Sequence, residues 1–529
     1  MRLRSVRVLR NVVTNYLRFF AGGLLGMIVT PIMVHALGDG GYGLWVTVFS
    51  LTGYFGLIDQ GIRPSLVRYV SRDHALGDQE GLRRTLNSAL ALFGVAGIVT
   101  LAATFVVAEN FQHWFTIDAA HRAVVRDVVR IAGVSVAAGF PLGVFAAVLS
   151  GLQRYDLGNG VGIGIGIVRA LVFVLVLRWG GGLVELAWAS LALSLLGHLL
   201  TMGLVLRLLP EFRFGWRWVQ AASLRAIGSY GGVAFVGALA SSLAFQTDAL
   251  VITALIAAAA VTPFSLAAGL VETVRSLVYS ATFVLSPTAS ELETKGETAK
   301  LHAMLLAGAK YSVLLSWPVL FGLMIFGDNF LVTWVGAAYA TTQPWSRVLT
   351  PGGPQASAAQ VLTLLAAPTL LALPQSTASA LLYGVSRHRG VVVISLAGAL
   401  LNLGLSLLWA RPLGLAGVAL GTALPLALLG GVGLGVYACR SLGMPLARYA
   451  WEGMGRAGLA SLAFAAPALA VNAWWHPVGW LPLGLACGGC WLVFAWVTWS
   501  WAVDEGERGR WGRAFGGLLR REPAAEGAR

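Results

Sequence analysis

The sequence predicts an all-α, polytopic membrane protein, and three observations carry this prediction. Hydrophobic residues make up 57 % of the 529 residues and charged residues only 11 %, whereas a soluble domain carries about a quarter charged residues. The mean hydropathy is +0.75. Apolar runs of about 20 residues, the length that crosses a bilayer as a helix, recur along the whole chain. This composition excludes a soluble globular protein, a disordered chain and a nucleic-acid-binding domain, so no nucleic-acid partner is expected.

Windows of that length give fourteen predicted spans. The first run follows four arginines, but it is too long for the apolar region of a signal peptide and a second span follows at once, so we interpret it as a retained span. The predicted spans cover residues 12–36, 42–62, 86–108, 123–150, 157–178, 183–206, 226–252, 258–286, 302–327, 358–384, 390–410, 413–438, 457–474 and 479–502.

The basic residues orient these spans. Lys and Arg number 37 against 23 Asp and Glu, a formal charge of +14, and cytoplasmic loops of membrane proteins carry the excess of Lys and Arg. With a cytoplasmic N-terminus, the inner segments hold the cations of residues 2–10, 63–84, 154, 207–225, 295–300, 387–389, 440–456 and the tail after Trp501. The outer loops hold very few cations, among them Arg178, Arg347 and Arg411. We therefore expect both termini in the cytoplasm and the cations against anionic lipid headgroups.

An internal repeat divides most of the chain into two halves. Leu76-Gly77-Asp78 aligns with Lys295-Gly296-Glu297 at an offset of 219, Pro141 with Pro374 at 233, and the run from Leu183 with the run from Leu415 at 232. The repeat unit is six spans, an even number, so the halves are parallel and related by an axis along the membrane normal. We predict an N-terminal six-helix lobe (1–222), a C-terminal six-helix lobe (223–440), two appended transmembrane helices (441–502) and a cytoplasmic tail (503–529).

Several short motifs resemble those of the polysaccharide or oligosaccharide (O-antigen-type) flippases of the multidrug/oligosaccharidyl-lipid/polysaccharide exporter superfamily. They are Asn15, Leu37-Gly38-x-x-x-Tyr42-Gly43, Asp59-x-Gly61, the loop from Arg68 to Gly77, and Pro287-x-x-Ser290 followed by Gly296. The resemblance covers most of spans 1–12. It implies a MATE-like fold of two six-helix repeats plus two C-terminal helices, and a place in the bacterial plasma (inner) membrane.

The resemblance also implies a function. Such proteins move undecaprenyl-diphosphate-linked oligosaccharides, the repeat units of polysaccharide or lipopolysaccharide biosynthesis, to the outer leaflet by alternating access. Their partners are the lipid-linked oligosaccharide and the polysaccharide polymerase and assembly proteins. The lipid II flippases are a sister group with the same architecture, and a lipid II flippase stays open as one alternative. A MATE-type multidrug or cation antiporter stays open as an alternative, although the charges within the spans are mostly basic, which favours an anionic cargo.

Ionisable residues inside spans are costly and are functional candidates by default. Asn11, Asn15 and Arg18 share one face of the first span, where Arg18 either lines a substrate cavity or reaches back to the cytoplasmic interface. Glu272, Arg275 and Tyr279 share a face in the middle of span 8. There Arg275 either binds a phosphoryl group bidentately or forms a structural pair with Glu272.

Four further sets of residues complete the predicted site. Arg169 and Lys310 are further candidates to face the cavity, and the Gly160-x-Gly162-x-Gly164-x-Gly166 run beside Arg169 is expected to provide small packing faces. Asp248 either couples transport to H⁺ or Na⁺, a role for which Glu272 is also a candidate, or caps a helix end. Asp59 and Arg63 form either a cytoplasmic gate or an interfacial surface pair. The charged residues Arg122, Arg126, Asp127 and Arg130 at the outer start of span 4 are interpreted mainly as a solvated helix end.

An enzyme is not expected. The longest outer loop, residues 327–356, carries only Asp328 and Arg347 as charged residues and so holds no acid pair, and the eight histidines of the sequence are not at metal-ligand spacing. A membrane glycosyltransferase or polymerase is therefore the least favoured alternative. No catalytic residue, metal site or cofactor is predicted, apart from the coupling ion.

Overall fold

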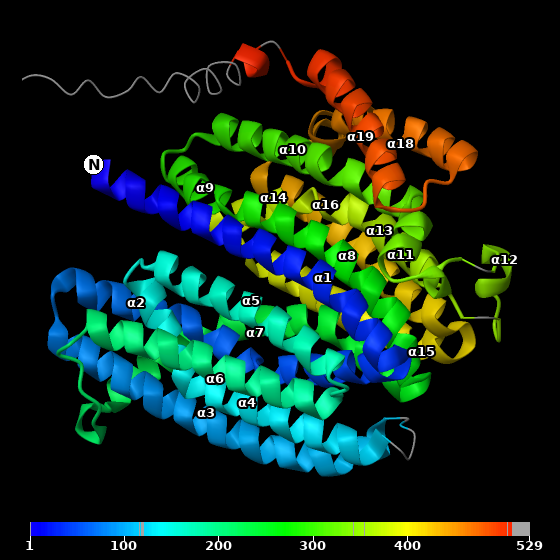
Figure 1. Cartoon of the computed structure of the whole chain (residues 1–529). Helices are drawn as coiled ribbons and strands as arrows, with labels where there is room; N and C mark the ends of the chain where they lie inside the picture. The colour runs from blue at the N-terminus through cyan, green and yellow to red at the C-terminus, as the bar shows by residue number, and fades with distance from the viewer. Residues whose placement is uncertain are drawn as a thin grey trace, which may run out of the picture. The chain divides into compact units, whose positions relative to one another are not determined.

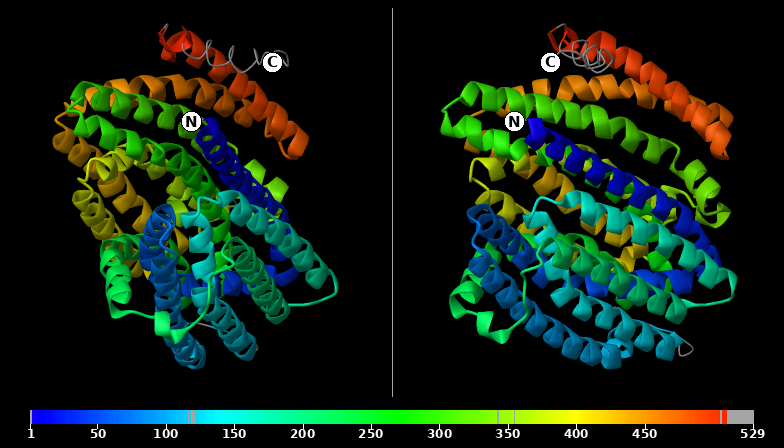
Figure 2. Two further views of the ribbon diagram at one scale, coloured as in Figure 1. Left: turned by 90° about the vertical axis from the view of Figure 1, so that its left-hand side faces the viewer. Right: turned by 60° about the vertical axis from the view of Figure 1, so that its left-hand side comes forward.

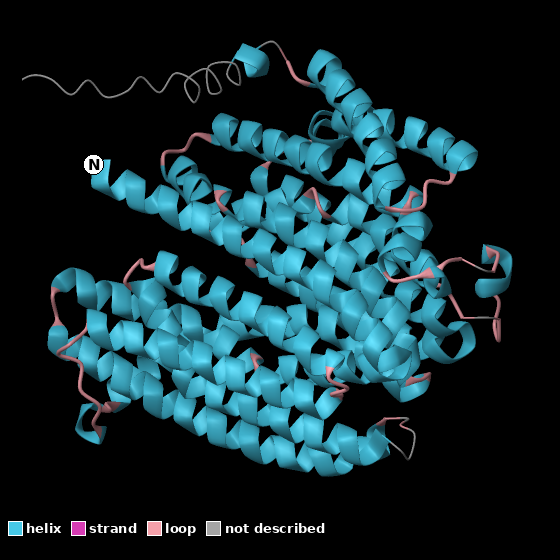
Figure 3. Cartoon of the chain, in the orientation of Figure 1, coloured by secondary structure: helices cyan, strands magenta, loops and turns pink. Residues whose placement is uncertain are grey.

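The computed structural model describes residues 2–115, 117, 121–341, 343–353, 355–504 and 506–509. Every regular element within these residues is helical and none is a strand (Figure 3). Ten helices are long and apolar enough to cross a membrane, or eleven if the bent pair α13 (Ala358–Ala372) and α14 (Gln375–Gly384) is one span. The prediction of an all-α, multi-pass membrane protein is confirmed, whereas the count of fourteen spans stays a prediction.

Two long helices contain a glycine break that bears on this count. The helix α1 (Arg2–Phe55) is interrupted at Gly38 (φ 68°), and α15 (Arg389–Pro425) at Gly414 (φ 57°). Only glycine adopts such positive φ angles without strain. A straight helix of 54 residues would be roughly 80 Å long, far more than the hydrocarbon thickness of about 30 Å. Both glycines lie close to boundaries that the sequence predicts between consecutive spans.

The two arms of α15 on either side of Gly414 fold back onto each other. The Oγ of Ser406 lies 3.5 Å from the Val418 carbonyl oxygen, and the Oγ1 of Thr422 lies 3.4 Å from Asn402 Oδ1. At Gly421, an added Cβ would lie 2.5 Å from Ser406 Oγ, so a larger residue would separate the arms. The arms therefore form a helical hairpin, as expected of two consecutive spans.

Two compact units make up the described chain. Unit 1 comprises residues 1–269, 341–365 and 392–425, and unit 2 comprises residues 270–340, 366–391 and 426–529. The lobe boundaries predicted from the repeat stay predictions. Of the predicted cytoplasmic tail, residues 510–529 lie outside the described part of the chain.

In unit 1, α4 (Arg122–Gly151) packs against α3 (Gln79–Trp114) and α6 (Leu183–Leu208), as Figure 1 shows. The helix α5 (Tyr155–Arg178) lies against α1, and α7 (Ala221–Leu255) lies against α2 (Leu57–Leu76). One apolar cluster joins α2, α3, α4, α6 and α7 through the buried side chains of Leu66, Phe93, Phe140, Val205 and Ile227.

In unit 2, the helices predicted as appended are packed on α10 (Thr298–Ile325). Both α18 (Arg456–Trp475) and α19 (Trp480–Val497) contact α10, and Figure 2 shows these helices together in two views. Val313, Phe464, Cys490 and Phe494 share one apolar cluster.

The remaining elements of the described chain are α8 (Ala258–Phe283), α9 (Leu285–Thr294), α11 (Gly327–Trp334), α12 (Trp345–Val348), α16 (Leu434–Leu442), α17 (Leu446–Arg448), the short 3₁₀ segments Trp216–Trp218 and Ala337–Tyr339, and the π-helical segments Leu426–Gly433, Tyr449–Gly455 and Thr498–Ala502.

Candidate functional site

The first set of candidate residues lies where α1 meets α5. The amide of Asn159, only 4 % exposed, donates to Asn15 Oδ1 at 2.7 Å and to Thr14 Oγ1 at 3.2 Å. Its carbonyl oxygen accepts a hydrogen bond from Arg18 Nη1 at 3.4 Å. Arg18 is exposed, and Arg169 lies exposed ten residues beyond Asn159 on α5. The structure thus brings Asn15 and Arg18 together around an amide that the sequence analysis did not single out. The side chain of Asn11 lies outside the described part of the chain.

A second set surrounds Asp248, a carboxylate on α7 that is 5 % exposed. Its Oδ2 accepts a hydrogen bond from the Thr422 hydroxyl at 2.8 Å. Its Oδ1 is buried and has no hydrogen-bond partner among the described residues. Asn402 and Ser406 continue the polar cluster, with Ser406 Oγ donating to Asn402 Oδ1 at 3.0 Å. The hairpin at Gly414 assembles this oxygen-rich site, because Asn402 and Thr422 stand on its two arms.

The third set is the pair in α8. Arg275 Nε lies 3.7 Å from Glu272 Oε2, with the arginine side chain 14 % exposed and the glutamate 47 % exposed. The hydroxyl of Ser276 donates to Glu272 Oε1 at 3.2 Å, and Tyr279, one turn further on, is exposed. At 3.7 Å the pair attracts electrostatically but lacks the short, aligned contact of a strong charge-assisted hydrogen bond.

Lys310 has a partner from beyond the last predicted span. Its Nζ donates to Glu507 Oε2 at 2.7 Å, and both side chains are 12 % exposed. Burial alone raises the pKa of Glu507. The hydrogen bond from Lys310, the backbone amide of Asp504, the charge of Lys310 and the Tyr311 hydroxyl outweigh this effect and lower the pKa. Lys310 is thus closely neutralised within unit 2, which distinguishes it from Arg18.

Asp59 and Arg63 form an ion pair within α2. Arg63 donates through Nη2 and Nε to Asp59 Oδ2, at 2.6 and 3.0 Å. The side chains are 25 % and 39 % exposed, respectively. The structure therefore shows the pair, while its predicted role as a gate stays a prediction.

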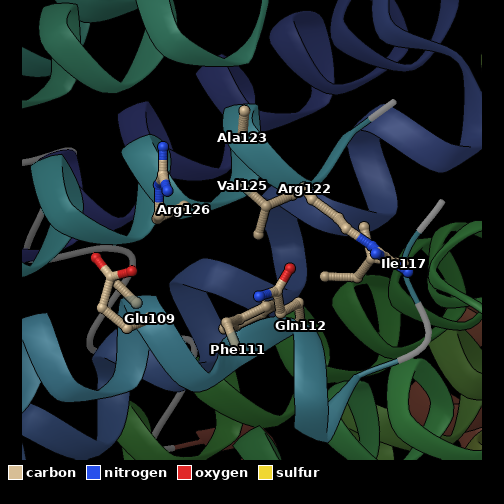
Figure 4. Close-up of a pocket in the computed structure, with 9 residues that line it drawn as sticks. Glu109, Phe111, Gln112, Ile117, Arg122, Ala123, Val125 and Arg126 are labelled. Carbon is tan, nitrogen blue, oxygen red and sulfur yellow. The ribbon is translucent and has the colours of Figure 1, made fainter. Parts of the chain in front are cut away.

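A pocket of about 270 Å³ opens between the end of α3 and the start of α4 (Figure 4). Gln112, Arg122 and Arg126 line it together with Glu109, which forms an ion pair with Arg130. Arg130 also lies 3.6 Å from Asp127. The charges at this helix end therefore largely pair with one another.

Within the described residues, no group of three His, Cys, Asp or Glu side chains is placed to hold a metal ion.

Sequence reasoning found one member of most of these clusters and missed its partners. Asn159 is a lone amide beside a glycine run, a signal that could have been followed. Thr422, Asn402 and Ser406 gave no such signal, because threonine, asparagine and serine are common in packed membrane helices. Glu507 lies outside every predicted span. Unit 1 contains the predicted site residues Asn15, Arg18, Asp59, Arg63, Arg169 and Asp248. Unit 2 contains Glu272, Arg275, Tyr279 and Lys310.

Comparison with known proteins places the chain in a family. The family described as "Polysaccharide biosynthesis protein" matches residues 8–293, just over half of the chain. The chain belongs to the polysaccharide biosynthesis protein family. It is also 21 % identical over 338 residues to the "Uncharacterized membrane protein EpsK" of Bacillus subtilis (strain 168), and the match covers 63 % of this chain and 66 % of that relative, slightly less than two thirds of the relative's length.

Solved structures share the fold of this family member. The lipid II flippase MurJ in its inward closed conformation superposes with a TM-score of 0.69 at 13 % identity, covering 93 % of this chain and 98 % of that one. An inward-facing MATE multidrug resistance transporter superposes with a TM-score of 0.68 at 14 % identity, covering 80 % and 94 %. The predicted MATE-like fold is confirmed.

Proposed function

We propose that the chain is a flippase that moves an undecaprenyl-diphosphate-linked oligosaccharide across the bacterial plasma membrane by alternating access. Membership of the polysaccharide biosynthesis family and the MATE-like fold support this proposal. Repeated helical bundles of this kind transport by rocking one half against the other around a central substrate site. No bond is made or broken in such a step, so the protein acts as a transporter and not as an enzyme.

The environment of Arg18 carries the proposal. A guanidinium within an apolar span is costly, and the hydrogen-bond partner that the structure gives Arg18 is a neutral amide. Its positive charge is therefore not cancelled by that partner. An arginine offers five N–H donors in a planar fork that matches the oxygens of a phosphate. Arg18 fits a role in binding the diphosphate, with Asn15 beside it.

Arg275, in unit 2, is the second arginine that we propose for binding the diphosphate, and Glu272 and Tyr279 lie on the same helix face. Its contact with Glu272 is 3.7 Å long, so a diphosphate can compete with the glutamate for the guanidinium. We include Arg169 as an exposed cation on α5. Lys310 is left out of the proposed anion site, because Glu507 already holds its ammonium at 2.7 Å.

We further propose that Asp248 binds the coupling ion. A buried carboxylate in a membrane must be paired, protonated or bound to a cation. Beside Asp248 lie the hydroxyl oxygen of Thr422 and, next to it, the amide oxygen of Asn402. Oxygen atoms of this kind are the ligands of hard cations. Either Na⁺ or a proton fits the uncompensated Oδ1, and Glu272 is the alternative position for coupling.

The decisive experiment uses the full chain in proteoliposomes with a fluorescent undecaprenyl-diphosphate oligosaccharide. We expect the probe to move between leaflets only when the protein is present, and Arg18→Gln and Arg275→Gln to abolish this movement while the proteins insert normally. Normal movement with both variants would contradict the diphosphate role. In a bacterial host lacking its own polysaccharide flippase, the same variants should fail to restore surface glycan.

Two alternatives are outcomes of further assays. Movement of lipid II but not of the oligosaccharide would assign the chain the function of the lipid II flippases. Resistance of a drug-sensitive host to cationic drugs, without glycan export, would assign it to the multidrug antiporters. In the proposed setting, both termini face the cytoplasm, the basic segments contact anionic lipids, and a polysaccharide polymerase receives the exported unit.

A further inference from the structure

The geometry around Arg18 points to a fixed position for its guanidinium, and we propose that Asn159 and Gly162 are the positioning residues that define it. We call these two residues the seat of Arg18. This inference rests on the proposed function, because it concerns how the same arginine is presented to a diphosphate. The two residues stand on one face of α5, three positions apart, opposite the polar face of α1.

Asn159 supplies the polar half of the seat. An amide has two N–H donors and one carbonyl acceptor, and here the donors go to Thr14 and Asn15 while the acceptor faces Arg18. Because arginine has no acceptor, the amide can take only this orientation. Both N–H donors are used, and Asn159 is 4 % exposed, so the side chain is fixed from two directions.

The chemistry of the amide matters as much as its position. An aspartate here would accept the same hydrogen bond but would bring a negative charge and cancel that of Arg18. An alanine would remove the acceptor and leave the arginine unheld. Asparagine both holds the guanidinium and leaves its positive charge available, which is what binding of an anion requires.

Gly162 supplies the space. A Cβ added at this position would lie 3.1 Å from Arg18 Nε and 3.2 Å from Cζ, tighter than ordinary van der Waals contact. Arg18 therefore lies against the glycine, and a Cβ there requires the guanidinium to shift by a few tenths of an ångström. The branched side chain of a valine requires a larger shift. Gly164, two residues on in the same helix, would place a Cβ in open space with nothing within 4 Å. The run of glycines thus contains one position where a side chain would meet Arg18 and another where it would not.

This contrast provides a matched pair of variants, Gly162→Val and Gly164→Val. The test measures binding of farnesyl diphosphate to the purified full chain, with farnesol as the probe that lacks the diphosphate. We expect Gly162→Val to weaken binding of farnesyl diphosphate about tenfold, equivalent to about 1.4 kcal/mol, and Gly164→Val to leave it unchanged. Binding of farnesol should not change in either variant.

Asn159→Asp tests the polar half with a residue of the same size and shape. We expect it to weaken farnesyl diphosphate binding at least as much as Gly162→Val, since the carboxylate neutralises Arg18. If both residues act through Arg18, neither substitution should weaken binding further in an Arg18→Gln background. A purely structural defect would lower binding further in that background as well.

The outcomes separate the two proposals. If Arg18→Gln weakens binding but Gly162→Val matches Gly164→Val and Asn159→Asp matches the wild type, the seat is refuted and the proposed function stands. If Arg18→Gln binds farnesyl diphosphate as the wild type does, both the seat and the diphosphate role of Arg18 are wrong.

Discussion

The carboxylate of Asp248 accepts a hydrogen bond from the hydroxyl of Thr422 at 2.8 Å, although 174 positions separate the two residues. Thr422 stands on the second arm of the hairpin that the break at Gly414 makes in α15, and Asn402 on the first arm lies next to it. A single glycine break thus assembles a buried polar site from residues that no local pattern connects. The first prediction concerns this site.

Removing the charge of Asp248 should uncouple transport from its driving ion. We expect Asp248→Asn to reduce transport driven by a Na⁺ or proton gradient by about tenfold or more, since the amide can neither carry a proton nor neutralise a cation. Imposing each gradient separately on proteoliposomes identifies the ion. Thr422→Ser, which keeps the hydroxyl, is the matched control and should retain coupling. Unchanged gradient dependence in Asp248→Asn would remove this residue from the coupling step.

Transport should require Arg275, and a lysine at this position should replace it only in part. We expect Arg275→Gln to reduce flipping by about tenfold or more, and Arg275→Lys to retain only part of it, because an ammonium lacks the bidentate fork. The measurement is surface glycan per inserted protein. Arg448→Gln is the control, since Arg448 pairs with Glu452 and is half exposed. Full activity of Arg275→Gln would leave the pair with Glu272 as a structural contact.

Asp59 and Arg63 test the predicted cytoplasmic gate. Because the pair is partly exposed, breaking it should cost less than about 1 kcal/mol of stability. A gate predicts a several-fold change in the transport rate for Asp59→Asn despite this small cost. The swap Asp59→Arg with Arg63→Asp should restore part of the rate, since the reversed order of charges is less favourable on a helix. An unchanged rate in Asp59→Asn would identify a surface pair only.

Glu507 should stabilise unit 2 in a pH-dependent way. Its pKa is lowered in the folded protein, so the ionised form contributes stability that is complete above its ordinary value of 4.5 and is lost as the pH falls through the lowered value. Glu507→Gln should therefore lower the Tm at pH 7, by the equivalent of about 1.5–3 kcal/mol. The difference from the wild type should shrink in acid, below about pH 4. Melting curves of the purified protein across this range provide the measurement, and a constant difference would exclude the carboxylate charge as the cause.

The fold could be predicted largely from the sequence because its signal is strong and local. Runs of about 20 apolar residues and the placement of arginines are enough to predict a multi-pass helical protein. The breaks at Gly38 and Gly414 lie near boundaries set by the same hydropathy. The structure is needed to show which glycines interrupt a helix, because many other glycines of the chain have helical backbone angles.

The candidate site was only partly accessible to sequence reasoning. Charged residues within spans stand out, so Arg18, Asp248 and Arg275 could be selected directly. Their partners could not, because Asn159, Thr422 and Asn402 are neutral and depend on long-range packing. Lys310 shows the limit most clearly: its charge suggested a cavity, whereas a carboxylate 197 positions later holds it.

The contact between Lys310 and Glu507 also sets where the chain can safely be shortened. Hydropathy alone would place the end of the folded lobe at the last apolar helix, near Ala502. A protein cut there would lose the counter-ion of a mostly buried lysine, and unpaired charges of this kind destabilise a fold. Affinity tags, fluorescent fusions and truncations should therefore leave Glu507 in place.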